Sequence, residues 1–159
     1  MLFAVVVTMA VKAFTGGDKL QAYLAKMARK VGNPATLQVG WLANAVYPDG
    51  TRVAMVAAIH EFGAPKAHIP MRSFFRPMIA SKSPHWGLAL AKNLKANDYD
   101  AAKALELMGE GIKGQLQQAI VDFVGVPLKA STIAAKGFDK QLIDTGHMKD
   151  SVDYKVEVA

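Results

Sequence analysis

The chain has 159 residues, which suits one domain large enough to bury a hydrophobic core. It contains no cysteine, which excludes disulfide bridges, thiolate zinc sites and cysteine nucleophiles. Its net charge is +6, with twelve bases and three acids in residues 1–95 but seven bases and ten acids in residues 96–159. This asymmetry is typical of copies that attract each other head to tail, or of a surface that binds nucleic acid.

The first residues are predicted to form a buried strand. Residues 2–11 are apolar and rich in β-branched side chains. The run spans about ten residues, half of the ~20 that an apolar helix needs to cross a membrane. The first base, Lys12, follows the run, whereas a secretory signal carries positive charge before it. We therefore expect neither a membrane anchor nor a secretory leader.

Hydrophobic periodicity and turn residues predict the remaining elements. The first elements are a helix with a basic outer face over residues 19–31 after a cap at Asp18, a strand over 36–42 and a turn over 47–50. A short helix capped by Thr51 and stopped by Gly63 follows, then an irregular segment over 64–75, and helical stretches over 76–82 and 86–94 separated by a break at Ser83-Pro84. The last elements are a long helix from Asn97 or Asp98 to 124, a helical turn over 131–137, a connector over 142–151 with a cap at Thr145, and a strand over 152–158.

Strands near both ends of a helical middle predict a single α+β domain over residues 1–159. A small, mostly antiparallel sheet from the terminal strands should pack against several helices, including one long helix in the C-terminal half. Gly109, Gly111 and Gly114 each weaken that long helix by roughly 1 kcal/mol relative to alanine. Close packing against a neighbouring helix or subunit is the expected reason for them.

Catalytic and metal-binding patterns are absent from the sequence. His60-Glu61 begins like a zinc-protease motif, but Ala64 stands where the second histidine belongs. There is no phosphate loop, nucleophile elbow or dinucleotide-binding turn. We expect no catalytic, metal-binding or cofactor-binding residues. The remaining enzymatic alternative is a hydrolase that uses Asp144 or His60, which would need a pocket joining the two.

Residues 61–77 form the most informative segment, because arginines, adjacent aromatics and prolines gather there without a regular pattern. Prolines lower the entropy that such a segment loses on binding, and arginine and aromatic side chains dominate interface energies. A docking role is therefore favoured. In the alternative structural interpretation, Phe74 and Phe75 fill the core and Arg72 pairs with Glu61.

Two blocks of sequence resemble the tail-completion and head–tail joining proteins of tailed bacteriophages, also grouped as virion morphogenesis or minor tail proteins. The first block is Glu61-Phe62-Gly63 followed by Ile69-Pro70-x-Arg72-x-Phe74-x-Arg76-Pro77. The second runs from Pro127 to Phe138 and then through Leu142-Ile143-Asp144-Thr145-Gly146-x-Met148-x-x-Ser151-Val152. The resemblance covers about residues 40–158; the N-terminal strand and Lys66-Ala67-His68 depart from it.

The resemblance implies a structural protein of the virion, without catalysis or a cofactor, made in the bacterial cytoplasm and placed at the head–tail junction. Its partners would be other copies of itself in a ring, the tail tube or terminator, and the head connector, with no membrane. The expected assembly interface comprises Glu61, Phe62, Gly63, Pro70, Arg72, Phe74, Arg76, Pro77, Asp144, Thr145 and Gly146. The alternative function is that of a DNA-binding accessory protein using the basic helix over residues 19–30.

Overall fold

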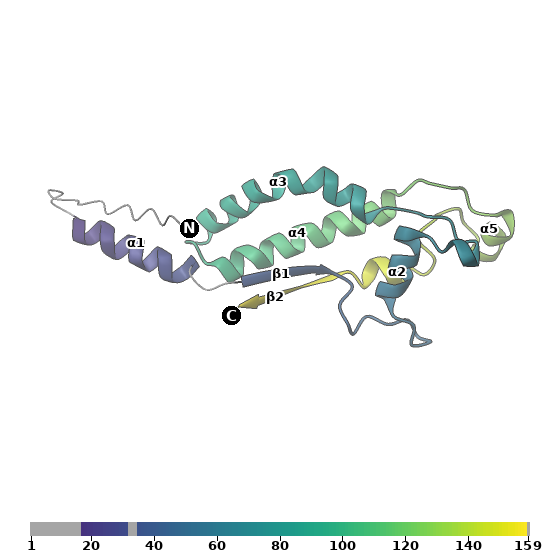
Figure 1. Cartoon of the computed structure of the whole chain (residues 1–159), viewed down its shortest axis with the longest axis horizontal. Coiled ribbons are helices and arrows are strands. Elements are labelled where there is room, and N and C mark those ends of the chain that lie inside the picture. Colours follow the sequence, from purple (N-terminus) through teal and green to yellow (C-terminus); the bar gives the residue numbers. More distant parts are fainter. Residues whose placement is uncertain (1–16, 32–34, 159) are drawn as a thin grey trace, which may run out of the picture.

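The structure is a computed structural model, and it describes residues 17–31 and 35–158. The predicted strand over residues 2–11 lies outside this part of the chain. The described residues form six α-helices, one short 3-10 helix and a two-stranded sheet, confirming the α+β class (Figure 1). Their order is α1 (Gly17–Val31), β1 (Ala35–Gly40), α2 (Val53–Phe62), η1 (Pro65–Ala67), α3 (Phe75–Ala96), α4 (Ala101–Asp122), α5 (Ala130–Lys136), α6 (His147–Asp150) and β2 (Asp153–Val158).

The sheet is an antiparallel pair that lies along α4 (Figure 1). Its register places Ala35 opposite Val158 and Gly40 opposite Asp153. Gly109 of α4 permits this contact, because a Cβ atom there would lie 2.4 Å from Tyr154 Cδ2 and 3.0 Å from Leu37 Cδ1. Intramolecular packing of the sheet on the helix therefore explains the first of the three glycines.

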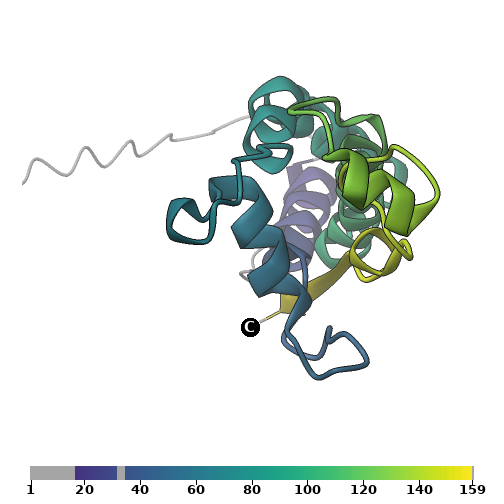
Figure 2. The same ribbon diagram turned by 90° about the vertical axis from the view of Figure 1, so that its right-hand side faces the viewer.

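The hydrophobic core lies at one end of an elongated molecule. There α2, the beginning of α3, the end of α4 and residues 142–152 converge (Figure 2). Trp41 joins these parts, since its Nε1 donates a hydrogen bond to the Met148 carbonyl at 2.7 Å and its ring packs edge-on to Phe74. The buried core residues are Val53, Ala57, Phe74, Met78, Leu116, Ile120, Leu142, Met148 and Val152.

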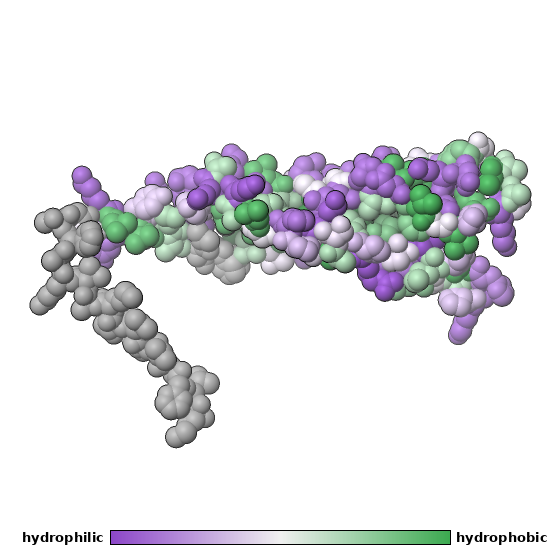
Figure 3. Space-filling view, turned by 90° about the horizontal axis from the view of Figure 1, so that it is seen from above, coloured by the Kyte–Doolittle hydropathy of each residue, from purple (hydrophilic) through white to green (hydrophobic). Residues whose placement is uncertain are grey.

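Helix α1 lies at the opposite end and extends away from this core (Figure 1). Its sequence has the predicted amphipathic pattern, yet Leu20, Tyr23 and Leu24 are 57%, 51% and 54% exposed. Hydrophobic atoms accordingly lie on the surface at the α1 end (Figure 3). Among the described residues, no helix is both long enough and apolar enough to cross a membrane.

The predicted break at Ser83-Pro84 is wrong, because α3 continues through Pro84. A proline inside a helix removes one backbone hydrogen bond and crowds the preceding turn. Helix α3 nevertheless packs along α4 on both sides of the proline, where Met78 is buried and Trp86 Nε1 donates to Gln115 Oε1 at 2.9 Å. Tertiary packing thus outweighs the local preference.

Three predicted helix starts are also corrected. Helix α4 begins at Ala101, with the Asp100 carboxylate accepting from the Lys103 amide at 3.1 Å. Asp98 adopts a positive φ of 52° in the tight turn before it, which is incompatible with a helix that begins there. Helix α1 begins at Gly17, one residue before the predicted Asp18 cap. Thr51 does not cap α2, whose N-cap is Arg52.

Candidate functional site

Glu61, near the end of α2, fixes the backbone of residues 73–76. Its side chain is buried, with an exposed fraction of 4%. The carboxylate accepts hydrogen bonds from the Ser73 hydroxyl at 2.7 Å and from the amides of Phe74 and Phe75, both at 2.9 Å. It also accepts from the Arg76 amide at 3.2 Å and from Arg76 Nε at 2.8 Å. We call this arrangement the Glu61 clamp.

The clamp places a negative charge at the beginning of α3, where free amides and the helix dipole favour it. The α3 N-cap residue, Phe74, cannot supply a capping oxygen, so α2 provides one instead. Burial alone would raise the pKa of Glu61. Hydrogen bonds from Ser73, Arg76 and the amides of Phe75 and Phe74 outweigh burial and lower that pKa to about 2. Glu61 is therefore ionised at neutral pH.

The partner of Glu61 is Arg76, not Arg72 as the structural interpretation predicted. The Arg76 guanidinium also lies over the Phe62 ring, 4.9 Å from its centroid. The Arg72 amide donates to the His60 carbonyl at 2.7 Å, while Arg72 Nε is buried without a hydrogen-bond partner within the described residues. One ion pair thus ties the end of α2 to the beginning of α3.

Gly63 is required at the turn between α2 and η1. Its φ is 73°, a conformation that residues with a side chain rarely adopt. A Cβ atom at this position would also lie 2.9 Å from the Met71 amide nitrogen and 3.1 Å from the Ile69 carbonyl oxygen. The returning backbone therefore passes directly against Gly63, which explains the glycine in the Glu-Phe-Gly block.

Within the second block, residues 144–146 form a turn before α6. The Thr145 hydroxyl accepts from the His147 amide at 3.4 Å, but the N-cap of α6 is Gly146, with a φ of 84°, and not Thr145 as predicted. This turn and His60 line the same open cavity of about 600 Å³. Helix α2 therefore connects the two blocks: Glu61 clamps the first, and His60 lies beside the second.

This cavity joins His60 and Asp144, the pair that the hydrolase alternative requires. In the described part of the chain, however, His60 Nδ1 is buried without a hydrogen-bond partner, and no acid orients the ring. Burial and the nearby charges of Arg72 and Lys136 lower the pKa of His60, which keeps the imidazole neutral at neutral pH. The cavity therefore lacks the base–orienter contact that is typical of catalytic sites.

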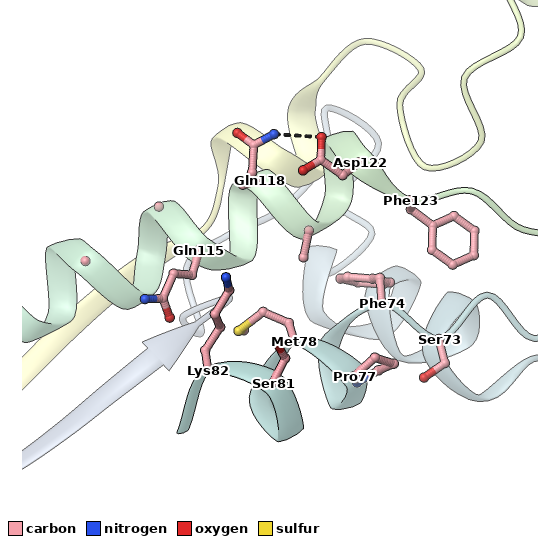
Figure 4. A pocket seen from close by; sticks show the side chains of 13 residues that line it. Ser73, Phe74, Pro77, Met78, Ser81, Lys82, Gln115, Gln118, Asp122 and Phe123 are labelled. Carbon is pink, nitrogen blue, oxygen red and sulfur yellow. Dashed lines mark hydrogen bonds between the residues drawn. The ribbon is translucent and has the colours of Figure 1, made fainter. Parts of the chain in front are cut away.

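A second cavity, of about 570 Å³, lies between the beginning of α3 and the end of α4 (Figure 4). Phe74, Pro77 and Met78 lie on the α3 side, and Gln115 and Phe123 on the α4 side. No three His, Asp or Glu side chains in the described ranges are placed to hold a metal ion. Lys82, Gln118 and Asp122 also line the groove, so its surface mixes apolar and charged side chains.

The predicted interface residues differ in their exposure. Glu61 and Phe74 are buried, so they position the segment and do not offer contact surface; Phe74 fills the core as the structural interpretation proposed. Ser73, whose hydroxyl donates to Glu61, is not among the predicted residues, although serine just before a helix is a typical capping residue. The half-buried residues are Gly63, Arg72 and Gly146, and the exposed residues are Phe62, Pro70, Arg76, Pro77, Asp144 and Thr145.

Comparison of the chain with protein-family models, with curated proteins and with solved structures finds no match. Its function is therefore inferred from its own residues and their arrangement.

Proposed function

We propose that this chain is a structural virion protein at the head–tail junction of a tailed bacteriophage and acts by protein–protein assembly, without catalysis or a cofactor. The observation that carries the proposal is the Glu61 clamp within the block of residues 61–77 that resembles the tail-completion family. Copies of the same chain, the tail tube or terminator and the head connector would be its partners. It would be made in the bacterial cytoplasm and retained in the particle.

The clamp supports binding because it holds a surface segment rigid before any partner arrives. Around it, Phe62 and Met71 are 63% and 57% exposed, and the Arg76 side chain is 55% exposed. Aromatic residues, methionine and arginine are enriched at protein interfaces. A rigid segment loses less conformational entropy on docking than a flexible one does. The clamp thus prepares this surface for a partner.

The test replaces Met71 with Asp in the phage that encodes the chain. We expect fewer infectious particles, with unjoined heads and tails visible by electron microscopy, because a charge would lie in the contact. Leu88→Asp is the matched control, since Leu88 is similarly exposed, at 64% against 57% for Met71, but lies on α3, outside both blocks. Wild-type yields of joined particles from Met71→Asp, or absence of the protein from purified particles, would contradict the proposal.

A second function, DNA binding, is favoured by the distribution of charge on two helices. Together α1 and α3 contain eight Lys and Arg residues but only one acid, Asp18. Lysines and arginines that neutralise phosphates produce affinity that falls steeply with salt. Replacing Lys19, Lys26 and Arg29 with Gln should then weaken binding to duplex DNA and reduce its salt dependence. Absence of duplex binding at low salt would eliminate this function.

A further inference from the structure

Helix α2 has an outward surface without a single polar side chain. Its residues Val53, Ala57 and Glu61 face inward and are buried. The outward residues Met55 and Phe62 are 53% and 63% exposed. We define the α2 face as Ala54, Met55, Ala58 and Phe62, all of which are exposed. Contiguous apolar surface of this kind is typical of an interaction site.

Positive charge borders the α2 face. Arg52 is exposed in the turn that begins the helix, and the Arg76 guanidinium covers part of the Phe62 ring at the other end. The acid in α2, Glu61, is buried and already paired with Arg76. A partner that complements this surface should therefore be apolar in the middle and negatively charged at its edge.

The outward surface of α4 has these properties from Glu106 to Gly114, and exposed Lys103 lies one turn before it. Leu107 is 48% exposed, and Glu106 and Glu110 beside it are exposed and form no ion pair within the described residues. Gly111 and Gly114 lie on the same side, four and seven residues after Leu107. We define the α4 face as Glu106, Leu107, Glu110, Gly111 and Gly114.

The two glycines of the α4 face pack closely against no other part of the described fold, and both line the open groove between α3 and α4. A Cβ atom at Gly111 or Gly114 would meet no atom within 4 Å, in contrast to Gly109. Glycine lowers the stability of a helix interior, so its presence there suggests a neighbour that approaches closely. Such a neighbour must come from outside the described chain.

We propose that the α2 face of one copy docks on the α4 face of a second copy. The two faces are complementary in shape, because bulky Met55 and Phe62 would pack where the glycines of α4 have no side chain. They are also complementary in charge, because Arg52 would lie near Glu106 and Glu110. Because the two faces differ, each copy can use both, and repetition produces a closed ring or an open filament. This deepens the proposed function by naming the surfaces that join like copies, and it is tested on the purified protein alone.

The experiment reverses the charges one face at a time and measures mass against concentration by analytical ultracentrifugation. Arg52→Glu alone, and Glu106→Lys with Glu110→Lys, should each weaken self-association by roughly tenfold or more. Mixing the two variants, or combining all three substitutions in one chain, should restore it, since attractive pairs form again. A wild-type chain that stays monomeric across the series, or variants without rescue, would overturn the proposal.

Gly114→Leu separates association from folding. Since the monomer has room for a side chain there, this variant should have an unchanged or higher thermal midpoint but weaker self-association. Leu88→Asp, on α3, is the control that should associate like the wild type. Undiminished association of Gly114→Leu would overturn the docking geometry. If Met71→Asp abolishes joined phage particles while the variants of the α2 and α4 faces self-associate normally, the proposed virion role stands and this interface is rejected.

Discussion

The two ends of this molecule use hydrophobic residues differently. At the core end, α2, α3, α4 and the C-terminal segment bury nine residues in one cluster. At the other end, α1 has a well-formed apolar stripe, yet its large side chains remain about half exposed. A helical hydrophobic pattern thus predicts the helix correctly but does not identify what covers it. Periodicity is a property of one segment, whereas burial requires a second segment that packs against it.

The difference between the ends should be largest in paired leucine truncations. Leu116→Ala, in the core, should lower the free energy of unfolding by about 2–5 kcal/mol, because it removes a fully buried side chain and leaves a cavity. Leu24→Ala on α1 should change it by less than about 0.5 kcal/mol. Urea denaturation of the isolated chain measures both. Equal losses would show that α1 is covered in solution.

Substitution of Glu61 with Gln should be the next largest effect. The glutamine side chain has the shape of glutamate but no charge, and its NH2 group would face backbone amides of α3, which are also donors. We expect a loss of about 3 kcal/mol in the free energy of unfolding at neutral pH. Asp98→Asn, which removes the exposed ion pair with Lys30 at the α1 end, is the control and should leave stability unchanged.

The pH dependence of stability tests the same contribution of Glu61. The pKa of Glu61 is lowered from 4.5 to about 2 in the folded chain, so its stabilisation is complete above pH 4.5. It is lost as the pH falls toward 2, and amounts to about 3 kcal/mol. The difference in stability between the wild type and Glu61→Gln should shrink over this range in denaturation at fixed pH. A constant difference would contradict the clamp.

The smallest effects distinguish two glycines of one helix. Gly109→Ala should lower the free energy of unfolding by about 1–3 kcal/mol, because the added Cβ overlaps the Tyr154 ring. Gly114→Ala should raise it by up to about 1 kcal/mol, since alanine favours the helix and meets open space. Thermal denaturation compares the two. Similar signs would contradict the packing of the sheet on α4.

Sequence patterns were sufficient for the α+β class and for the approximate bounds of α1, β1, α2, α5 and β2. These follow from local periodicity, from turn residues and from the stop at Gly63, which act within a few residues of chain. The same patterns singled out Glu61, Arg76 and the turn at residues 144–146. They assigned the wrong arginine to Glu61, because residues 72 and 76 are equally plausible partners until the chain direction after Gly63 is known.

Only the tertiary structure determined which of these elements contact one another. Helix α3 continues through Pro84 because its packing on α4 offsets the cost of a proline inside a helix. Glu61, predicted as an interface residue, is buried and accepts hydrogen bonds from the first amides of α3. The tertiary structure also separated Gly109, filled by the sheet, from Gly111 and Gly114, which face open space. Contacts between residues 13 to 72 positions apart determine these outcomes, and local patterns do not contain them.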